Sequence, residues 1–294
     1  MTSEKKNQVL LPYELERDIF ELTARAYPCE AVKLSTISKY VQEWVEAVIY
    51  ETVVLDFPLS RTESFLDTFL SRPPSFFART VKRLHITTVV PFTQARAIIA
   101  ACSNITDLTC WADPNNIRED LISVIPSEQI HRLSIKLTGL WGAFSERPSQ
   151  QFTPKLFPNL THLEIVNPTG PNARVQIDLD GLLSLPKLTH LALGELWIHY
   201  HLDLIPHLQR ALEQSPKLRV LLLISRDVHF LDFLAKSGVQ RDCRVVVQEE
   251  FCGPLSAEDY WEEIRQGGMD FWSSAEKMVL ENSRNSGAET ILKA

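Results

Sequence analysis

Short segments in which apolar and polar residues alternate recur along the chain, each with a leucine at its centre. Six of them occupy 81–87, 105–111, 130–136, 160–166, 188–194 and 218–224. Their central leucines are 24, 25, 30, 28 and 30 residues apart: Leu84, Leu108, Leu133, Leu163, Leu191 and Leu221. Related segments at 52–57 and 243–248 extend the series at both ends. Alternation of this kind is typical of a half-buried strand, so the pattern predicts one strand in every repeat.

Segments with helical spacing separate these strands, at 62–70, 93–103, 204–215 and 229–238. A proline comes shortly before three of the strands, in FPNLTHL, LPKLTHL and SPKLRVL, where it ends the preceding helix. Strands and helices therefore alternate, as they also do in a doubly wound α/β domain. The strands of that fold are buried on both faces and form continuous apolar runs, whereas these strands mostly alternate.

The repeat resembles that of the leucine-rich repeat family, whose period is about 20 to 29 residues. Each strand fits the frame apolar-x-x-Leu-x-apolar or a close variant of it. The resemblance implies an α/β solenoid, curved like a horseshoe, over residues 51–250. The Asn or Cys that usually follows the strand in this family is mostly missing, which implies irregular loops.

The N-terminal residues 9–50 contain no glycine and repeat apolar residues at helical spacing, which predicts several short helices. They resemble the F-box, an all-α unit with an opening Leu-Pro-x-Glu-Leu and a following Ile-Phe, and with a later Leu-x-x-Val-Ser/Cys-Lys/Arg stretch and tryptophan. The residues that carry the resemblance are Leu11, Pro12, Glu14, Leu15, Ile19, Phe20, Leu34, Ile37, Ser38, Lys39 and Trp44. Fungal F-box-like proteins with degenerate leucine-rich repeats show this order.

The F-box resemblance implies a partner, the Skp-type linker protein of a cullin-RING ubiquitin ligase. The implied linker-binding residues are Leu11, Pro12, Leu15, Ile19, Phe20, Leu34, Ile37 and Trp44. Two features depart from the commonest pattern, because the tryptophan comes late and the segment TARAYPCEA between helices is long. The alternative is a helical cap that only covers the exposed edge of the first repeat, as every solenoid requires.

The repeat register also predicts which side chains lie on the inner, concave face of the sheet. Residues next to the central leucine point away from the core, because side chains alternate along a strand. The predicted substrate-binding residues are Arg83, His85, Asp107, Trp111, Arg132, Lys136, His162, Glu164 and His190. Charged residues, histidines and one tryptophan suit a hydrated recognition surface, although any solvated sheet face carries similar residues. Farther along, the same face becomes small or apolar at Ala192, Leu222 and Ile224.

Residues 254–281 carry a high density of aromatic side chains, including Tyr260, Trp261, Phe271 and Trp272. Burying a large apolar side chain is worth roughly 1.5 to 3 kcal/mol, enough for four of them to offset the cost of ordering two short helices. This segment is therefore predicted to fold back as a C-terminal helical cap, over the last repeat or over the apolar concave positions. Residues 282–294 are predicted to be disordered, since they have no apolar period.

Composition narrows the function classes. A net charge of −7 and a pI of about 5.7 give no overall attraction to nucleic acid or to an anionic membrane surface. The first apolar run, Val9–Leu11, is too short for a signal peptide, and no window of about 18 apolar residues follows. Five cysteines without a CxxC motif indicate reduced thiols. We therefore expect a cytoplasmic or nuclear protein with no nucleic-acid or membrane partner.

Catalytic chemistry has few candidates. The sequence contains neither GxGxxG nor GxxxxGK[ST] nor GxSxG, so no cofactor is expected. His199 and His201, followed by Asp203, are the one compact cluster with a metal-ligand order; on a strand they would share a face. We expect a binding protein and not an enzyme: a substrate-recruiting adaptor, with a repeat protein unconnected to ubiquitin ligases and a metal-dependent enzyme as the alternatives.

Overall fold

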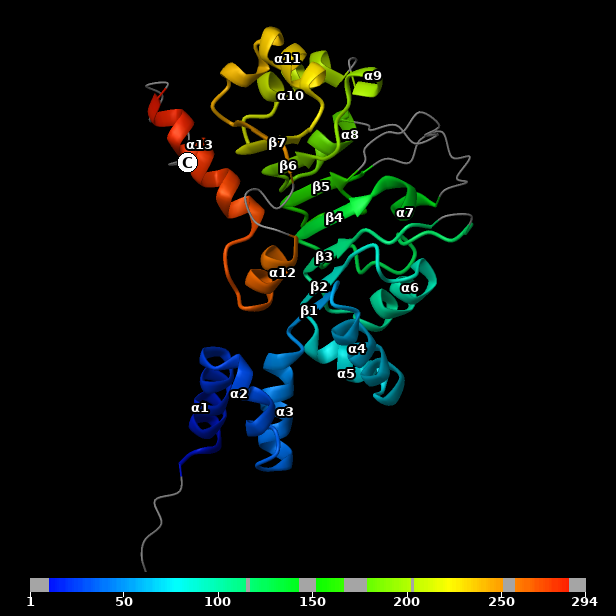
Figure 1. Cartoon of the computed structure of the whole chain (residues 1–294), viewed down its shortest axis with the longest axis vertical. Coiled ribbons are helices and arrows are strands. Elements are labelled where there is room, and N and C mark those ends of the chain that lie inside the picture. Colours follow the sequence, from blue (N-terminus) through cyan, green and yellow to red (C-terminus); the bar gives the residue numbers. More distant parts are fainter. Residues whose placement is uncertain are drawn as a thin grey trace, which may run out of the picture.

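Eight parallel strands form the centre of the protein, in the order in which they occur along the chain (Figure 1). The computed structural model describes residues 11–114, 117–142, 152–166, 179–201, 204–250 and 257–285. The strands are β1 (Thr52–Leu55), β2 (Arg83–Ile86), β3 (Asp107–Cys110), β4 (Arg132–Lys136), β5 (His162–Val166), β6 (His190–Leu193), β7 (Val220–Ile224) and β8 (Val245–Gln248). Each falls within a segment that the alternating pattern predicts.

The strand register places the central leucines opposite one another. One continuous row across the sheet consists of Leu84, Leu108, Leu133, Leu163, Leu191 and Leu221, with Val53 and Val245 at its ends. The repeat spacing therefore predicts the pairing correctly, even though the intervals between leucines differ by several residues. The extra residues lie in the connections, where length is tolerated.

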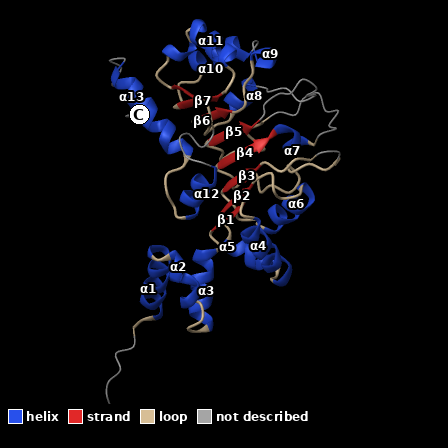
Figure 2. Cartoon of the chain, viewed as in Figure 1, coloured by secondary structure: helices blue, strands red, loops and turns tan. Residues whose placement is uncertain are grey.

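Helices between the strands lie on one side of the sheet (Figure 2). They are α4 (Leu59–Ser71), α5 (Pro74–Thr80), α6 (Phe92–Ala101), α7 (Leu137–Trp141), α8 (Leu179–Ser184), α9 (Ile198–His201), α10 (Leu204–Gln214) and α11 (Val228–Ser237), with a 3₁₀ turn at Val239–Arg241. The fold is mixed α/β with a single parallel sheet. A doubly wound domain has connecting helices on both faces and a reversal of strand order. Here the described connecting helices lie on one face, and the strand order does not reverse.

The main hydrophobic core lies between this helical layer and the sheet. The leucine row packs there against apolar side chains from the helices, such as Phe77, Ile98, Leu208 and Phe230. Leu163, near the middle of the row, is completely buried. Each strand thus uses one side for the main core, which leaves the other side of the sheet to be covered separately.

The N-terminal unit consists of α1 (Tyr13–Ala26), α2 (Pro28–Leu34) and α3 (Lys39–Ile49) at one end of the molecule (Figure 1). It has its own small core of Ala24, Ala31, Val41, Trp44 and Val45. Ser38 begins α3 as its N-cap, accepting a hydrogen bond from the Val41 amide at 3.3 Å. Residues 9 and 10 of the predicted unit lie outside the described residues.

Salt bridges of two glutamates connect the N-terminal unit to the first repeat. Glu51 lies between α3 and β1 and pairs with Arg25 of α1 at 2.6 Å and with Arg83 of β2 at 3.1 Å. Glu46 of α3 pairs with Arg72, which follows α4, at 2.6 Å. The third helix also packs against α5. The unit is therefore attached along α3, while α1 lies farther from the sheet (Figure 1).

The C-terminal tail, which we define as α12 (Ala257–Arg265) and α13 (Phe271–Asn285), lies on the side of the sheet opposite to the other helices (Figure 1). Gly267 has a φ of +74° in the turn between the two helices, a backbone conformation that favours glycine. Residues 254–256 lie outside the described residues.

The prediction that disorder begins at residue 282 is wrong for its first four residues, because α13 continues to Asn285. The Asn282 side chain donates a hydrogen bond to the Val245 carbonyl oxygen at 3.4 Å, and Ser283 is buried. Polar contacts hold these residues in place, so the absence of an apolar period in the sequence did not indicate that they are ordered. Residues 286–294 lie outside the described residues.

Replacement of a leucine in the central row tests how far the whole fold depends on it. Leu163→Ala should lower the free energy of unfolding by about 2–5 kcal/mol, because it leaves a cavity in the main core. Leu70→Ala is the matched control, since Leu70 on α4 is 83% exposed and should change stability by less than about 0.5 kcal/mol. Urea unfolding followed by circular dichroism measures both. Equal stabilities for the two variants would contradict the central role of the leucine row.

Candidate functional site

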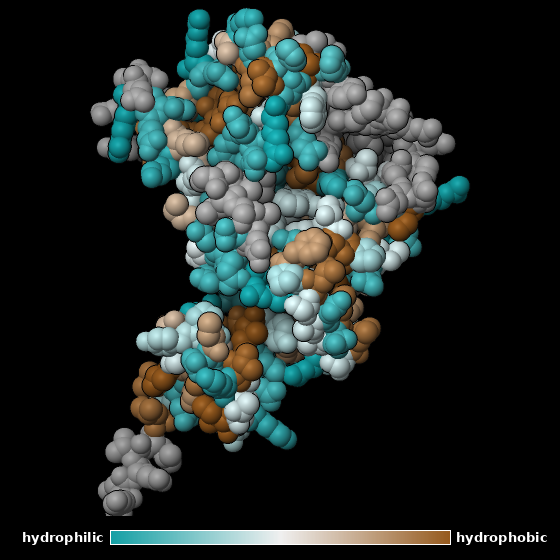
Figure 3. Space-filling view, viewed as in Figure 1, coloured by the Kyte–Doolittle hydropathy of each residue, from teal (hydrophilic) through white to brown (hydrophobic). Residues whose placement is uncertain are grey.

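The predicted linker-binding residues fall into two groups. Leu11, Leu15, Ile19 and Ile37 are each about half exposed, between 49% and 58%, and Pro12 is exposed at the start of α1. Figure 3 shows apolar side chains gathered on the surface of this unit. These residues are available to a partner.

Three of the predicted contact residues are not freely available. Trp44 is buried in the core of the unit, and Phe20 and Leu34 are half-buried against it. The Trp44 ring also contacts Tyr13 edge-on, with centroids 4.9 Å apart. The prediction of direct linker contact is wrong for Trp44, because the small core of three helices needs its largest apolar side chain at the centre.

Sequence reasoning missed several exposed apolar residues of the same unit. Tyr13, Leu22, Val32 and Tyr40 are each more than half exposed. Leu22 follows Ile19 by three positions and Leu15 by seven, which places all three on one face of α1. The helical spacing in the sequence contains this signal, but it does not separate the face that packs inward from the face that stays open.

The predicted substrate-binding residues lie together on the face of the sheet that the tail covers. The register aligns Arg83, Asp107, Arg132, His162 and His190 in one row. The next row contains His85, Thr109, Ser134, Glu164, Ala192 and Leu222. The sequence therefore places these side chains on the same face correctly.

The expectation of an open, hydrated face is wrong for His85, Glu164 and His190, which are at most 6% exposed because the tail lies over them. Lys136 is also largely covered and pairs with Asp113 at 2.8 Å. The side chains of Arg83 and Arg132 remain 43% and 41% exposed. The sequence predicts that the tail folds back over the last repeat or over the apolar positions of this face. In the structure the tail covers the apolar positions and part of the polar positions.

The apolar part of the face forms a second hydrophobic core with the tail. Ala192, Leu222 and Ile224 belong to this core, and α13 packs against β7 and β8. The tail contributes Tyr260, Trp261, Phe271, Trp272, Ala275 and Val279, all at most 7% exposed. The aromatic density that marks this segment in the sequence is therefore explained by burial against the sheet.

Two tryptophans of the tail occupy separate aromatic sites on the face. Trp261 contacts His85 and Trp111, with ring centroids 5.3 and 5.6 Å apart. Trp272 stands edge-on to His162 and His190, at 5.3 and 5.6 Å. The two histidine rings are stacked 4.0 Å apart. Each tryptophan is thus held by a pair of rings from neighbouring strands.

Acidic residues of the tail pair with basic residues close to these aromatic sites. Asp270 forms an ion pair with Arg132 of β4. Its other carboxylate oxygen accepts a hydrogen bond from the Ser273 amide at 2.9 Å, as an N-cap does for its helix. Glu262 pairs with Arg61 of α4 at 2.6 Å, and this hydrogen bond lowers the pKa of Glu262 to about 2.

Glu164 is a buried carboxyl group in the middle of the face. The Trp111 indole N–H donates to Ser134 Oγ at 2.8 Å, and the Ser134 hydroxyl donates to Glu164. Burial raises the pKa of Glu164 to about 8, although the hydrogen bond from Ser134 opposes the shift. Burial likewise raises the pKa of Asp107 to about 6, against the attraction of the Arg132 guanidinium. Burial disfavours the ionised form of both carboxyl groups.

Histidine chemistry on this face does not favour acid–base catalysis. His85 Nδ1 lies 3.0 Å from Thr109 Oγ1, the spacing of a hydroxyl and a base. Burial, however, lowers the pKa of His85 to about 3 and that of His162 to about 2. Burial also lowers the pKa of His190 and outweighs Glu276, whose carboxylate lies 3.0 Å from Nε2. A general base works best with a pKa near the operating pH, so these residues suit binding better.

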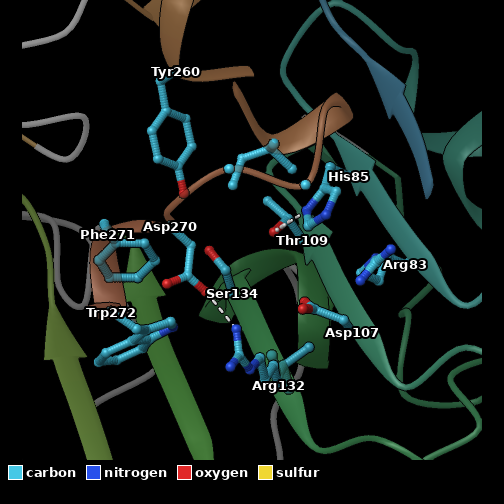
Figure 4. Close-up of a pocket in the computed structure, with 14 residues that line it drawn as sticks. Arg83, His85, Asp107, Thr109, Arg132, Ser134, Tyr260, Asp270, Phe271 and Trp272 are labelled. Atoms are coloured by element: carbon cyan, nitrogen blue, oxygen red, sulfur yellow. Dashed lines mark hydrogen bonds and ion pairs between the residues drawn. The ribbon is translucent and has the colours of Figure 1, made fainter. Parts of the chain in front are cut away.

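A cavity of about 150 Å³ lies between the sheet and the junction of α12 and α13. Figure 4 shows side chains from β2, β3 and β4 facing Tyr260, Asp270, Phe271 and Trp272 across it. The sheet side of this cavity is formed by Arg83, His85, Asp107, Thr109, Arg132, Leu133 and Ser134. The tail therefore covers the polar part of the face without filling it.

The alternative of a metal site at His199 and His201 assumed that both histidines lie on one strand. His199 lies on α9 and not on a strand, and positions two apart on a helix do not face each other. The side chain of His201 and the whole of Asp203 lie outside the described residues. Among the residues whose side chains the structure describes, no cluster of three histidine, cysteine, aspartate or glutamate side chains has metal-site geometry.

Comparison of the chain with protein-family models, with curated proteins and with solved structures gives no match. Within the described ranges, no helix has the length and apolar character needed to cross a membrane. Function is therefore inferred from the residues and their contacts.

The buried Glu164 predicts a specific pH dependence of stability. Its pKa is higher in the folded protein, about 8, than the ordinary value of 4.5, so the folded state binds more protons than the unfolded state between these values. The stability of the wild type should therefore fall as the pH rises from about 4.5 to 8.

Glu164→Gln keeps the shape of the side chain and removes this titration. The variant should be more stable than the wild type at pH 8 and should lose that advantage towards pH 4.5. Urea unfolding at several pH values measures the difference, with Glu281→Gln on the exposed side of α13 as the control. Parallel pH profiles for Glu164→Gln and the wild type would contradict the raised pKa.

Proposed function

We propose that the protein is a substrate-recruiting adaptor of a cullin-RING ubiquitin ligase. In this proposal the N-terminal unit is F-box-like and binds the Skp-type linker protein. The sheet and its helices form a leucine-rich-repeat solenoid that presents a protein substrate to the ligase. The protein acts by binding, and its place of action is the cytoplasm or nucleus.

The consecutive strand order supports the solenoid. Each repeat adds one strand beside the previous one and one connection on the same side, so that neighbouring repeats bury each other's leucines. The row from Leu84 to Leu221 is the regular element of this arrangement. Variable connections and missing Asn or Cys residues make the repeats degenerate.

The observation that carries the adaptor proposal is the exposed apolar surface of the N-terminal unit. Leu11, Leu15, Ile19, Leu22 and Ile37 remain about half exposed or more, although the unit has a separate core of its own. A group of exposed apolar residues on the surface of a helical unit is typical of a binding site for a protein partner. Four of these five positions are those that the F-box resemblance assigns to linker binding.

A simple capping role accounts less well for this surface. A cap turns its apolar face towards the repeat that it covers. Here the attachment to the first repeat includes the packing of α3 on α5, the ring contact of Tyr50 with Phe76 and the ion pairs of Glu46 and Glu51. The apolar residues of α1 stay open. An interaction module without a ligase connection would use the same surface, so the identity of the partner has to be tested.

Substitutions on α1 test the linker contact. Leu15→Ala combined with Ile19→Ala should weaken binding to the Skp-type linker at least about 100-fold, because two apolar anchors at the centre of an interface are lost. Alanine preserves the helix, and neither side chain belongs to the core of the unit. Isothermal titration calorimetry with the purified linker measures the affinity.

The matched control is Leu70→Ala combined with Val228→Ala, which removes two exposed apolar side chains from α4 and α11. This control should bind the linker like the wild type. Failure of the wild type to bind the linker would overturn the adaptor proposal, and so would unchanged affinity in the variant of Leu15 and Ile19.

A further inference from the structure

The tail is an imperfect cover for the polar part of the sheet face. His85 Nε2 and Arg265 Nη2 are buried and have no hydrogen-bond partner in the part of the chain that the structure describes. His85 lies beneath α12, and Arg265 ends α12. A buried polar group without a partner destabilises the folded state, because it loses its hydrogen bonds to water.

The cavity beneath the junction of α12 and α13 is a second sign of incomplete packing. This cavity has room for several heavy atoms and is partly open to solvent, since the Arg83 and Arg132 side chains in its lining are 43% and 41% exposed. Arg83, Asp107 and Thr109 line it from the sheet. Arg83 pairs with Glu51 and Thr109 with His85, so these polar groups make their contacts without the tail.

The contacts of the tail form a repeated pattern. Trp261 and its neighbour Glu262 engage a ring site and an arginine, and Trp272 with Asp270 does the same farther along. The two tryptophans are eleven positions apart in the sequence. Twice, therefore, an arginine outside the tail pairs with an acidic residue of the tail while a ring site on the sheet face holds a nearby tryptophan. Such an arrangement suits recognition of paired acidic and aromatic side chains.

We infer that this face is a peptide-binding surface and that the tail is its occupant within the chain. The partner that replaces the tail is a helical segment of another protein with two acidic–aromatic pairs about ten residues apart. Such a segment reproduces the contacts at Arg61, Arg132 and the two ring sites. It also fills the cavity with groups that form a hydrogen bond with His85 Nε2. The tail thereby keeps the face closed until a better-matched segment arrives.

This inference deepens the proposed function, because it names the chemistry of the recruited segment. It rests on that proposal only for the claim that the bound segment is a ubiquitination substrate. Binding of a segment to the face is measured without the linker, so that a failure of the ligase connection and a failure of the peptide site give different results.

Weakening the tail inside the full-length chain tests the inference. The probe is a fluorescent synthetic peptide with the sequence of residues 257–285, and the variant is Trp272→Ala in the protein. Since Trp272 is buried against His162 and His190, its loss should release the intramolecular competitor. The peptide should bind the variant at least about ten-fold more tightly than it binds the wild type, as measured by fluorescence anisotropy.

Two matched controls accompany this measurement. Leu280→Ala removes an exposed side chain from α13 and should leave peptide affinity at the wild-type level. A peptide that itself carries Trp272→Ala should bind the Trp272→Ala protein at least about ten-fold more weakly than the unmodified peptide. The second control shows that the ring site on the sheet recognises the tryptophan.

Folding of the variant is checked by circular dichroism. Should Trp272→Ala not fold, Glu262→Gln combined with Glu276→Gln replaces it, because this pair loses the contacts with Arg61 and His190 and keeps every apolar side chain. The absence of saturable peptide binding to a folded tail variant would overturn the inference. A concentration-dependent dimer of the wild type in light scattering would also overturn it, because the occupant would then be the tail of a second copy.

Discussion

Alignment of one leucine from each repeat is the constraint on which the rest of the structure depends. Side chains alternate along a strand, so a leucine row on the helical side places its neighbours on the opposite side in register. The rows of His85 and Arg132 on that opposite side follow directly from this alignment. A shift of one residue in any strand would exchange its two faces and would destroy both the core and the candidate site.

The opposite side of the sheet creates a second requirement, because a parallel sheet is normally covered on both faces. Here the chain supplies the cover from its own C-terminus, with Trp261 and Trp272 as the main apolar contacts. The cover matches the apolar strands β6 to β8 well. Over β2 to β5 it buries Glu164 and His85 and leaves a cavity. In the peptide-site proposal this contrast separates the half that packs as a core from the half that binds a partner.

The N-terminal unit and the sheet face differ in how they meet a partner. Leu15 and Ile19 are open to solvent, so a partner that docks there displaces only water. Glu164 and His190 are covered, so a partner that docks on the sheet has to compete with the tail. In the adaptor proposal this difference allows stable assembly at one end of the molecule and conditional recruitment along the other.

The sequence by itself determined the strands, their register and the residues that share a face, because one leucine repeat specifies both the period and the alternation. It also indicated that the tail folds back, over the last repeat or over Ala192, Leu222 and Ile224, since aromatic side chains such as Trp261 need burial. Only the tertiary structure decided how far the tail extends over the polar rows and that Trp44 lies inside its unit. The first outcome depends on the path of two helices across the sheet, and the second depends on the space inside a three-helix core. The order of apolar and polar residues along the chain specifies neither the path nor the space.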